Sequence, residues 1–127
     1  MIRVLIVDDD PDFLMQQKLQ LEHAGFEVLE ADNRQKAKQI VDSNTFDVAV
    51  LDLMMEDLDA GFVLARDIKR KNPAIPVIMV TGVASETGME FDAATQEERS
   101  WIKADALLAK PVRFEQLLRE INRLLKR

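Results

Sequence analysis

Residues 1–11 read MIRVLIVDDDP, and this stretch indicates how the chain folds. The aliphatic run over residues 2–7 is rich in β-branched side chains and ends in three aspartates, which is typical of a strand buried in a parallel sheet. Asp10 and Pro11 mark the start of a helix, because aspartate accepts hydrogen bonds from free backbone N–H groups and proline suits the first helical position. A strand, an acidic turn and a helix in this order form the repeating unit of an α/β protein.

The same unit recurs along the chain. Aliphatic runs predict strands at residues 2–7, 48–51 and 76–80, and weaker runs predict two more at residues 26–31 and 106–109. Helices are predicted from Pro11 to a glycine cap at Gly25, after a cap at Asn33, over residues 61–71, from a capping box at residues 95–98, and over the apolar stripe of residues 114–125. This alternation predicts an α/β fold with a doubly wound, five-stranded parallel sheet and helices on both faces.

The composition limits the class of protein. The length of 127 residues fits one domain, so we expect a single domain over residues 1–127 with no further domain. A content of 47% hydrophobic and 31% charged residues is ordinary for a globular protein. The formal net charge of −6 disfavours direct nucleic-acid binding, which normally needs a basic face. There is no cysteine, no signal-peptide pattern, and no apolar run near the roughly 20 residues of a membrane span. We therefore expect a cytoplasmic location with no membrane association.

Chemically reactive side chains follow the predicted strands at their carboxyl ends. Asp8 and Asp9 follow the first strand, Asp52 the third, Thr81 the fourth and Lys110 the fifth. Ligands of such sheets bind beyond the carboxyl ends of the strands, so these side chains should converge on one pocket. Clustered carboxylates repel one another unless a cation lies among them, and their oxygens suit Mg²⁺. A nucleophile, charge neutralisation and positioning groups together are what phosphoryl transfer needs.

These residues resemble the response-regulator receiver domains of two-component signal transduction, the CheY-like superfamily, and the match runs over essentially the whole chain. The matching motifs are the acidic pair Asp8-Asp9, Asp52 within VLDLMM, Thr81 within VTG, and Lys110-Pro111. The combination is specific, whereas each motif alone would be weak. The resemblance implies a flavodoxin-like (βα)5 fold with strand order 2-1-3-4-5.

The resemblance also implies a role for each residue. Asp52 would be the phosphorylation site, and Thr81 and Lys110 would contact the phosphoryl oxygens. The implied Mg²⁺ ligands are Asp9 directly, Asp8 through water, Asp52, and the backbone carbonyl of Met54. The Lys110-Pro111 peptide bond would be cis. Asp10, by contrast, is explained by helix capping.

A receiver is a signalling module and not an enzyme in the ordinary sense, since it catalyses only its own phosphotransfer and dephosphorylation. The resemblance implies that a histidine kinase or phosphotransfer protein donates the phosphoryl group to Asp52. Phosphorylation would then bias two conformations of the face formed by the fourth helix, fifth strand and fifth helix. That face would act on an unknown protein partner or form a phosphorylation-dependent dimer.

The chain departs from the family pattern in several places. Glu56 takes the place of the usual proline, Gly61 comes one residue late, residues 83–94 form an extended loop, and Leu107 stands where the family often has a switching aromatic residue. The two positions that normally orient the hydrolytic water are Met54 and Val83, which cannot do so by hydrogen bonding. Slow hydrolysis of the acyl phosphate is therefore expected.

Two other functions remain open from the sequence. A haloacid-dehalogenase-like phosphatase would use Asp8 as nucleophile in the pattern Asp8-x-Asp10, although Pro11 does not fit that family and the chain leaves no room for a cap domain. A non-phosphorylated pseudo-receiver would keep only the fold as an interaction module. The intact set of reactive residues argues against this second alternative.

Overall fold

The computed structural model describes residues 1–53, 60–81 and 104–126. Its strands are β1 (Arg3–Val7), β2 (Glu27–Ala31), β3 (Val48–Asp52), β4 (Val77–Thr81) and β5 (Ala106–Ala109). All neighbouring strands are parallel, in the order β2-β1-β3-β4-β5. The predicted fold class and strand order are thus confirmed. The helix expected from residue 95, the extended loop, Met54, Glu56 and Val83 lie outside the described residues.

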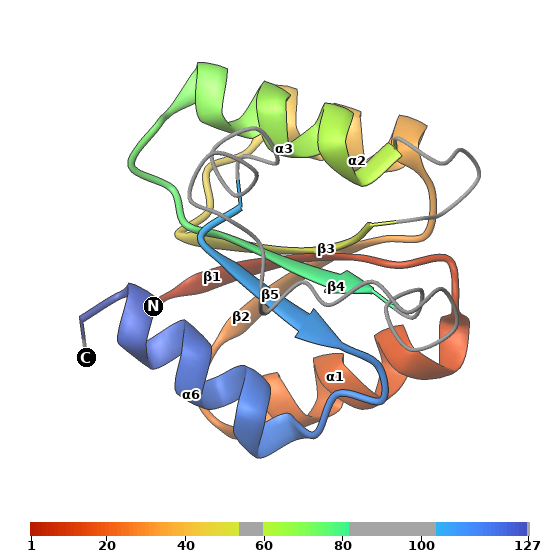
Figure 1. Ribbon diagram of the computed structural model, residues 1–127, viewed down its shortest axis with the longest axis vertical. Coiled ribbons are helices and arrows are strands. Elements are labelled where there is room, and N and C mark those ends of the chain that lie inside the picture. Colours follow the sequence, from red (N-terminus) through yellow and green to blue (C-terminus); the bar gives the residue numbers. More distant parts are fainter. Residues whose placement is uncertain (54–59, 82–103, 127) are drawn as a thin grey trace.

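Helices cover both faces of the sheet in Figure 1. The described helices are α1 (Pro11–His23), α2 (Arg34–Ser43), α3 (Ala60–Lys71) and α6 (Phe114–Leu124). The α2 and α3 helices lie on one face of the sheet, and α1 and α6 lie on the other (Figure 1). In the described part of the chain, no helix is both long enough and apolar enough to cross a membrane.

The core consists of two apolar layers because successive strand residues point to opposite faces of the sheet. Along β1, Leu5 and Val7 join the layer under α2 and α3, whereas Val4 and Ile6 join the layer under α1 and α6. Leu64 and Ile68 of α3 pack into the first layer. Leu117 and Ile121 of α6 pack into the second. Burying one such side chain contributes about 1.5–3 kcal/mol, so these two layers stabilise the sheet that carries the site at its carboxyl edge.

The α1 helix begins and ends as its sequence predicts. The Asp10 side chain accepts hydrogen bonds from the backbone N–H groups of Asp12 and Phe13, and Pro11 occupies the first helical position. After the helix, Gly25 adopts a φ of 98°, which glycine tolerates best. The N–H of Phe26 donates to the carbonyl of Leu21 and closes the helix end. Asp10 therefore has the structural role that was predicted for it.

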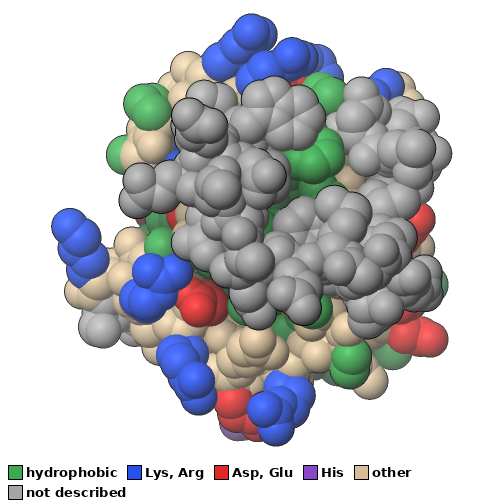
Figure 2. Space-filling model, viewed as in Figure 1, with side chains coloured by type: hydrophobic (Ala, Val, Ile, Leu, Met, Phe, Trp, Pro, Cys, Tyr) green, Lys and Arg blue, Asp and Glu red, His purple; other side chains and the backbone are tan. Residues whose placement is uncertain are grey.

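The basic side chains on the face shown in Figure 2 form separate groups. One group lies over the α2 and α3 layer, and another lies over α6 (Figure 2). The last turn of α3 carries Lys69, Arg70 and Lys71, and in α6 Arg123 pairs with Glu120 at 2.7 Å. Ion pairs of this kind on the surface contribute little to stability.

Candidate functional site

Strand register brings the reactive residues together at the carboxyl edge of the sheet. Val7 pairs with Leu51, so Asp8, which directly follows β1, lies beside Asp52, the last residue of β3. Hydrogen bonds hold the backbone at this edge. The N–H of Asp8 donates to Ala31 O at 3.2 Å, that of Leu53 to Val80 O at 2.8 Å, and that of Lys110 to Thr81 O at 2.8 Å. The predicted convergence of the strand ends is therefore present in the structure.

Three carboxylates form the acidic part of the site. Asp8, Asp9 and Asp52 each offer a carboxylate oxygen, and these oxygens lie within 4.8 Å of one another. Asp8 and Asp52 are buried, with 0% and 6% of their surface exposed, whereas Asp9 is exposed. Buried carboxylates at this spacing repel one another and need a cation nearby.

Lys110 is the described cation closest to these carboxylates. Its Nζ lies 3.0 Å from Asp8 Oδ2 and 3.7 Å from Asp52 Oδ2. Asp8 Oδ2 is buried, and its ion pair with Lys110 is its described side-chain contact. The lysine is thus nearer to Asp8 than to the predicted acceptor Asp52. The Lys110-Pro111 bond is cis, as the resemblance implied.

Charge in the site keeps Lys110 protonated. Its partial burial by itself lowers the pKa of the ammonium, but the contact with Asp8 and the charges of Asp8, Asp52 and Asp10 raise it more strongly. The resulting pKa of Lys110 is above the ordinary lysine value. Lys110 is therefore a permanent positive charge at neutral pH.

A cation such as Mg²⁺ fits this set of donors. Carboxylate oxygens are the ligands that Mg²⁺ prefers, and Asp8 Oδ2 is buried without a hydrogen bond. The other oxygen of Asp8, Oδ1, accepts the backbone N–H of Asp10 at 2.9 Å, which fixes the carboxylate. Thr81, which is 2% exposed, is the last residue of β4, the strand beside β3.

One contact was missed by the sequence analysis. The Nζ of Lys110 lies 5.1 Å from the centroid of the Phe13 ring, on the first turn of α1. No sequence pattern predicts this contact, because Phe13 lies near the start of the chain and Lys110 lies near its end. The ring adds a third neighbour to the lysine.

The start of α3 packs directly on the end of β3. A Cβ atom on Gly61 would lie 2.6 Å from the carbonyl oxygen of Asp52 and 2.8 Å from Cα of Leu53, both closer than atoms tolerate. The N–H of Gly61 donates to the carbonyl of Leu53 at 3.3 Å. Gly61, which has no side chain, therefore allows α3 to approach the backbone that carries Asp52.

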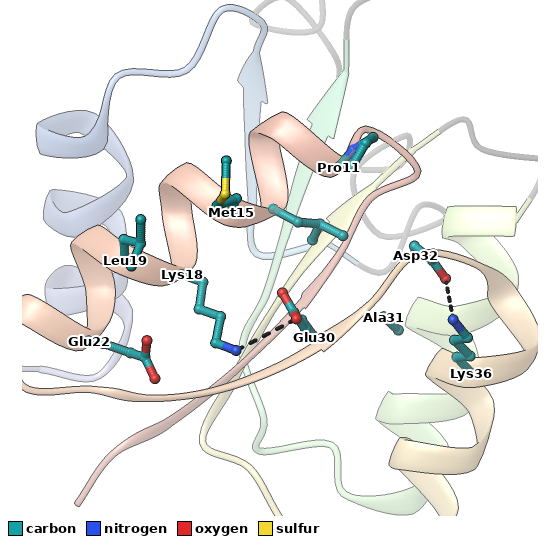
Figure 3. A pocket seen from close by; sticks show the side chains of 10 residues that line it. Pro11, Met15, Lys18, Leu19, Glu22, Glu30, Ala31, Asp32 and Lys36 are labelled. Atoms are coloured by element: carbon teal, nitrogen blue, oxygen red, sulfur yellow. Dashed lines mark ion pairs between the residues drawn. The ribbon is translucent and has the colours of Figure 1, made fainter.

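A groove of about 580 Å³ lies beside the site, between α1 and the end of β2 (Figure 3). Met15 and Leu19 of α1 line it and are largely exposed, at 56% and 62%. Its rim carries the ion pairs Lys18–Glu30 at 3.6 Å and Lys36–Asp32 at 3.1 Å. Among the residues that the structure describes, the predicted phosphorylation and metal residues Asp8, Asp9 and Asp52 do not line the groove.

Comparisons with known proteins agree with this architecture. The family model described as the response regulator receiver domain matches residues 4–122. The heme response regulator HssR of Staphylococcus aureus (strain Newman) is 32% identical over 130 residues, which cover 100% of this chain and 53% of that protein. The chain thus spans about half the length of the curated relatives it matches.

Solved structures give the same result. The CheY-like receiver domain protein from Methanospirillum hungatei JF-1 matches with a TM-score of 0.81 and 29% identity, covering 99% of this chain and 94% of that one. The chemotaxis response regulator CheY4 of Vibrio cholerae matches with a TM-score of 0.81 and 26% identity, covering 98% of each chain. The chain belongs to the response regulator receiver domain family.

Proposed function

We propose that this protein is a Mg²⁺-dependent phosphoacceptor module in which Asp52 receives a phosphoryl group from a histidine kinase or phosphotransfer protein. The observation that carries the proposal is the grouping of Asp52 with two further carboxylates and Lys110 at the carboxyl edge of the sheet. A structural role alone would favour pairing each buried carboxylate separately, since unpaired buried charge is costly.

The chemistry assigned to Asp52 is an in-line displacement. A carboxylate oxygen of Asp52 forms a bond to phosphorus as the bond from phosphorus to the donor nitrogen breaks, and the departing imidazole keeps the electron pair and takes up a proton. Lys110 would move its positive charge from Asp8 toward the phosphoryl oxygens. Thr81 would donate a hydrogen bond to one of them.

The metal would be held by Asp8, Asp9, Asp52 and the backbone carbonyl of Met54. When bound, Mg²⁺ supplies positive charge that offsets the negative charge of the phosphoryl group and of the three carboxylates. The main task of the chain's own residues is to hold these oxygens in place before phosphate arrives. The backbone N–H of Asp10 serves that task, because it donates a hydrogen bond to Asp8 Oδ1.

The signal would leave the site through β5 and α6, which connect directly to Lys110. A change in the position of Lys110 on phosphorylation would bias the conformation of the surface formed by β5 and α6. This change would alter the binding of that surface to a protein partner or to a second copy of the chain. Leu107 in β5 is half-buried against the core, so a rotating aromatic side chain is not part of this proposal. We place the module in the cytoplasm, where histidine kinases deliver phosphate.

The test is incubation with acetyl phosphate and Mg²⁺, followed by mass spectrometry of the intact protein and its peptides. We expect one added phosphoryl group on wild-type protein and none on Asp52→Asn. Equal labelling of that variant would contradict the assignment. Labelling that disappears only in Asp8→Asn would instead support a phosphatase that uses Asp8, and no labelling of the wild-type protein would support a pseudo-receiver.

A further inference from the structure

We propose that Phe13 is a positioning residue, whose ring face holds the Lys110 ammonium between Asp8 and Asp52 for the incoming phosphoryl group. This inference rests on the proposed function of Asp52. It gives a role in phosphoryl uptake to a side chain that is neither acidic nor a hydrogen-bond donor.

Three groups from three different elements surround the ammonium of Lys110. Its Nζ lies 3.0 Å from Asp8 Oδ2, 3.7 Å from Asp52 Oδ2 and 5.1 Å from the centroid of the Phe13 ring. A cation within about 6 Å of an aromatic ring centroid is attracted by the negative face of the ring. The ring has no net charge, so it attracts the lysine without repelling a phosphoryl group or competing for a metal.

Phe13 is itself held firmly in place. It lies in the first turn of α1, its backbone N–H donates to Asp10 Oδ1 at 3.4 Å, and its half-buried side chain packs against the core layer under α1 and α6. The N–H of Asp10 in turn donates to Asp8 Oδ1. Asp8, Asp10, Phe13 and Lys110 thus form a closed circuit of contacts that leads from one oxygen of Asp8 back to the other.

Lysine needs such an anchor more than a shorter side chain would. Its four-carbon stem loses much rotamer freedom when the ammonium is fixed at one point. With Asp8 as the nearer carboxylate, charge alone draws Lys110 away from Asp52. Once the carboxylates bind a cation and Asp52 takes up phosphate, the ring still attracts the ammonium. A leucine at position 13 would fill similar space but would not attract a cation.

The experiment measures the rate of phosphoryl uptake from acetyl phosphate at saturating Mg²⁺. We expect Phe13→Leu to lower the rate about threefold to tenfold, from the typical strength of a partly buried cation–π contact. Phe13→Trp should restore it, because tryptophan has the stronger ring for this contact. In a Lys110→Ala background, Phe13→Leu should cause no further loss, since the contact is already gone.

The matched control is Phe26→Leu. Phe26 is buried in the same core layer, at the other end of α1, and loses the same ring. We expect this variant to melt at a lower temperature and to keep the wild-type uptake rate. A role of Phe13 that is only structural would give the same result as this control.

A second measurement is independent of phosphorylation. In metal-free protein, NMR should show the ε-methylene protons of Lys110 upfield of those of exposed lysines, because they lie near the ring face. Phe13→Leu should remove this shift, and Phe26→Leu should keep it. The Mg²⁺ affinity of Phe13→Leu, measured by titration calorimetry, should equal that of wild type, since the ring carries no charge and supplies no metal ligand.

The two proposals fail in different ways. Absence of labelling in the wild-type protein would overturn the function of Asp52. Labelling of the wild type that is unaffected by Phe13→Leu, or a rate loss that persists in full in the Lys110→Ala background, would overturn only the positioning role. Loss of Mg²⁺ affinity in Phe13→Leu together with a lower melting temperature would also overturn it, because it would reveal general damage to the site.

Discussion

At the amino end of the sheet, Asp105 accepts two donors through one oxygen, the Lys69 ammonium at 2.7 Å and the Val77 N–H at 2.8 Å. At the carboxyl end, Asp8 and Asp52 are the carboxylates near a single lysine, Lys110. Both ends carry acidic side chains that follow or precede buried strands. They differ in how completely those charges are neutralised.

At the amino end, the described carboxylates Glu27, Asp47 and Asp105 each accept a hydrogen bond or form an ion pair. Arg3 pairs with Glu27 at 3.2 Å, and its backbone N–H donates to Asp47 at 2.8 Å. Lys69 also donates to Ile75 O at 2.8 Å, which joins α3 to the segment before β4. These contacts fasten elements to one another. The carboxyl end keeps an excess of negative charge, which is what a site for a cation and a phosphoryl group requires.

The largest expected effect is that of Gly61→Ala at the carboxyl end. The new Cβ would meet the backbone of Asp52 and Leu53 at 2.6–2.8 Å, and backbone atoms cannot rotate away. We expect a loss of about 3 kcal/mol in the free energy of unfolding, measured by urea denaturation, and slower labelling with acetyl phosphate. As a control, Gly25→Ala costs about 1 kcal/mol through its φ of 98° and should leave labelling unchanged. Equal losses of stability and equal labelling rates in the two variants would mean that the close packing of α3 on the backbone of Asp52 does not affect the phosphorylation site.

Asp105→Ala tests the amino end. The substitution leaves the Val77 N–H and the Lys69 ammonium without their carboxylate, so we expect a loss of about 1–2 kcal/mol in the free energy of unfolding. Asp105→Asn keeps an oxygen acceptor and should lose less. Urea denaturation measures both. An unchanged free energy of unfolding in Asp105→Ala would show that the contacts of this carboxylate with Val77 and Lys69 do not stabilise the fold.

Asp9→Asn, at the carboxyl end, should raise the free energy of unfolding in metal-free buffer, whereas Asp105→Ala should lower it. Removing one of three clustered carboxylates relieves repulsion, so in metal-free buffer the variant should be more stable, by up to about 1 kcal/mol because Asp9 is exposed. With Mg²⁺ in excess the order should reverse, since the wild type gains stability from binding. Thermal melts with and without Mg²⁺ measure this. A clear fall without metal would indicate that Asp9 has a structural partner.

The smallest expected effect concerns acid stability at the amino end. The hydrogen bond and charge of Arg3 hold the pKa of the Glu27 carboxyl below its usual range. Its contribution to stability is therefore present above the unfolded-state pKa of about 4.3 and is lost as the pH falls through the lower folded-state value. Glu27→Gln should weaken the dependence of stability on pH below about pH 4.3. Urea midpoints across that range measure it, and identical slopes for the two proteins would contradict the assignment.

The sequence by itself determined the strands, the described helices and which residues follow the strands at the carboxyl edge of the sheet. Aliphatic runs, caps such as Asp10 and Gly25, and the apolar stripe of α6 are local signals, and each lies within a few residues of the structure it specifies. Parallel topology then requires that residues following different strands meet at one edge. Asp8, Asp52 and Lys110 could therefore be placed together before their distances were known.

Only the tertiary structure decided how those side chains contact one another. Asp8 is buried while Asp9 is exposed, Lys110 lies nearer to Asp8 than to Asp52, and Phe13 lies beside the ammonium. Such contacts depend on strand register, on how closely α1 packs against the sheet, and on the rotamers of long side chains. They join residues far apart in the chain, and local periodicity contains no information about their distances.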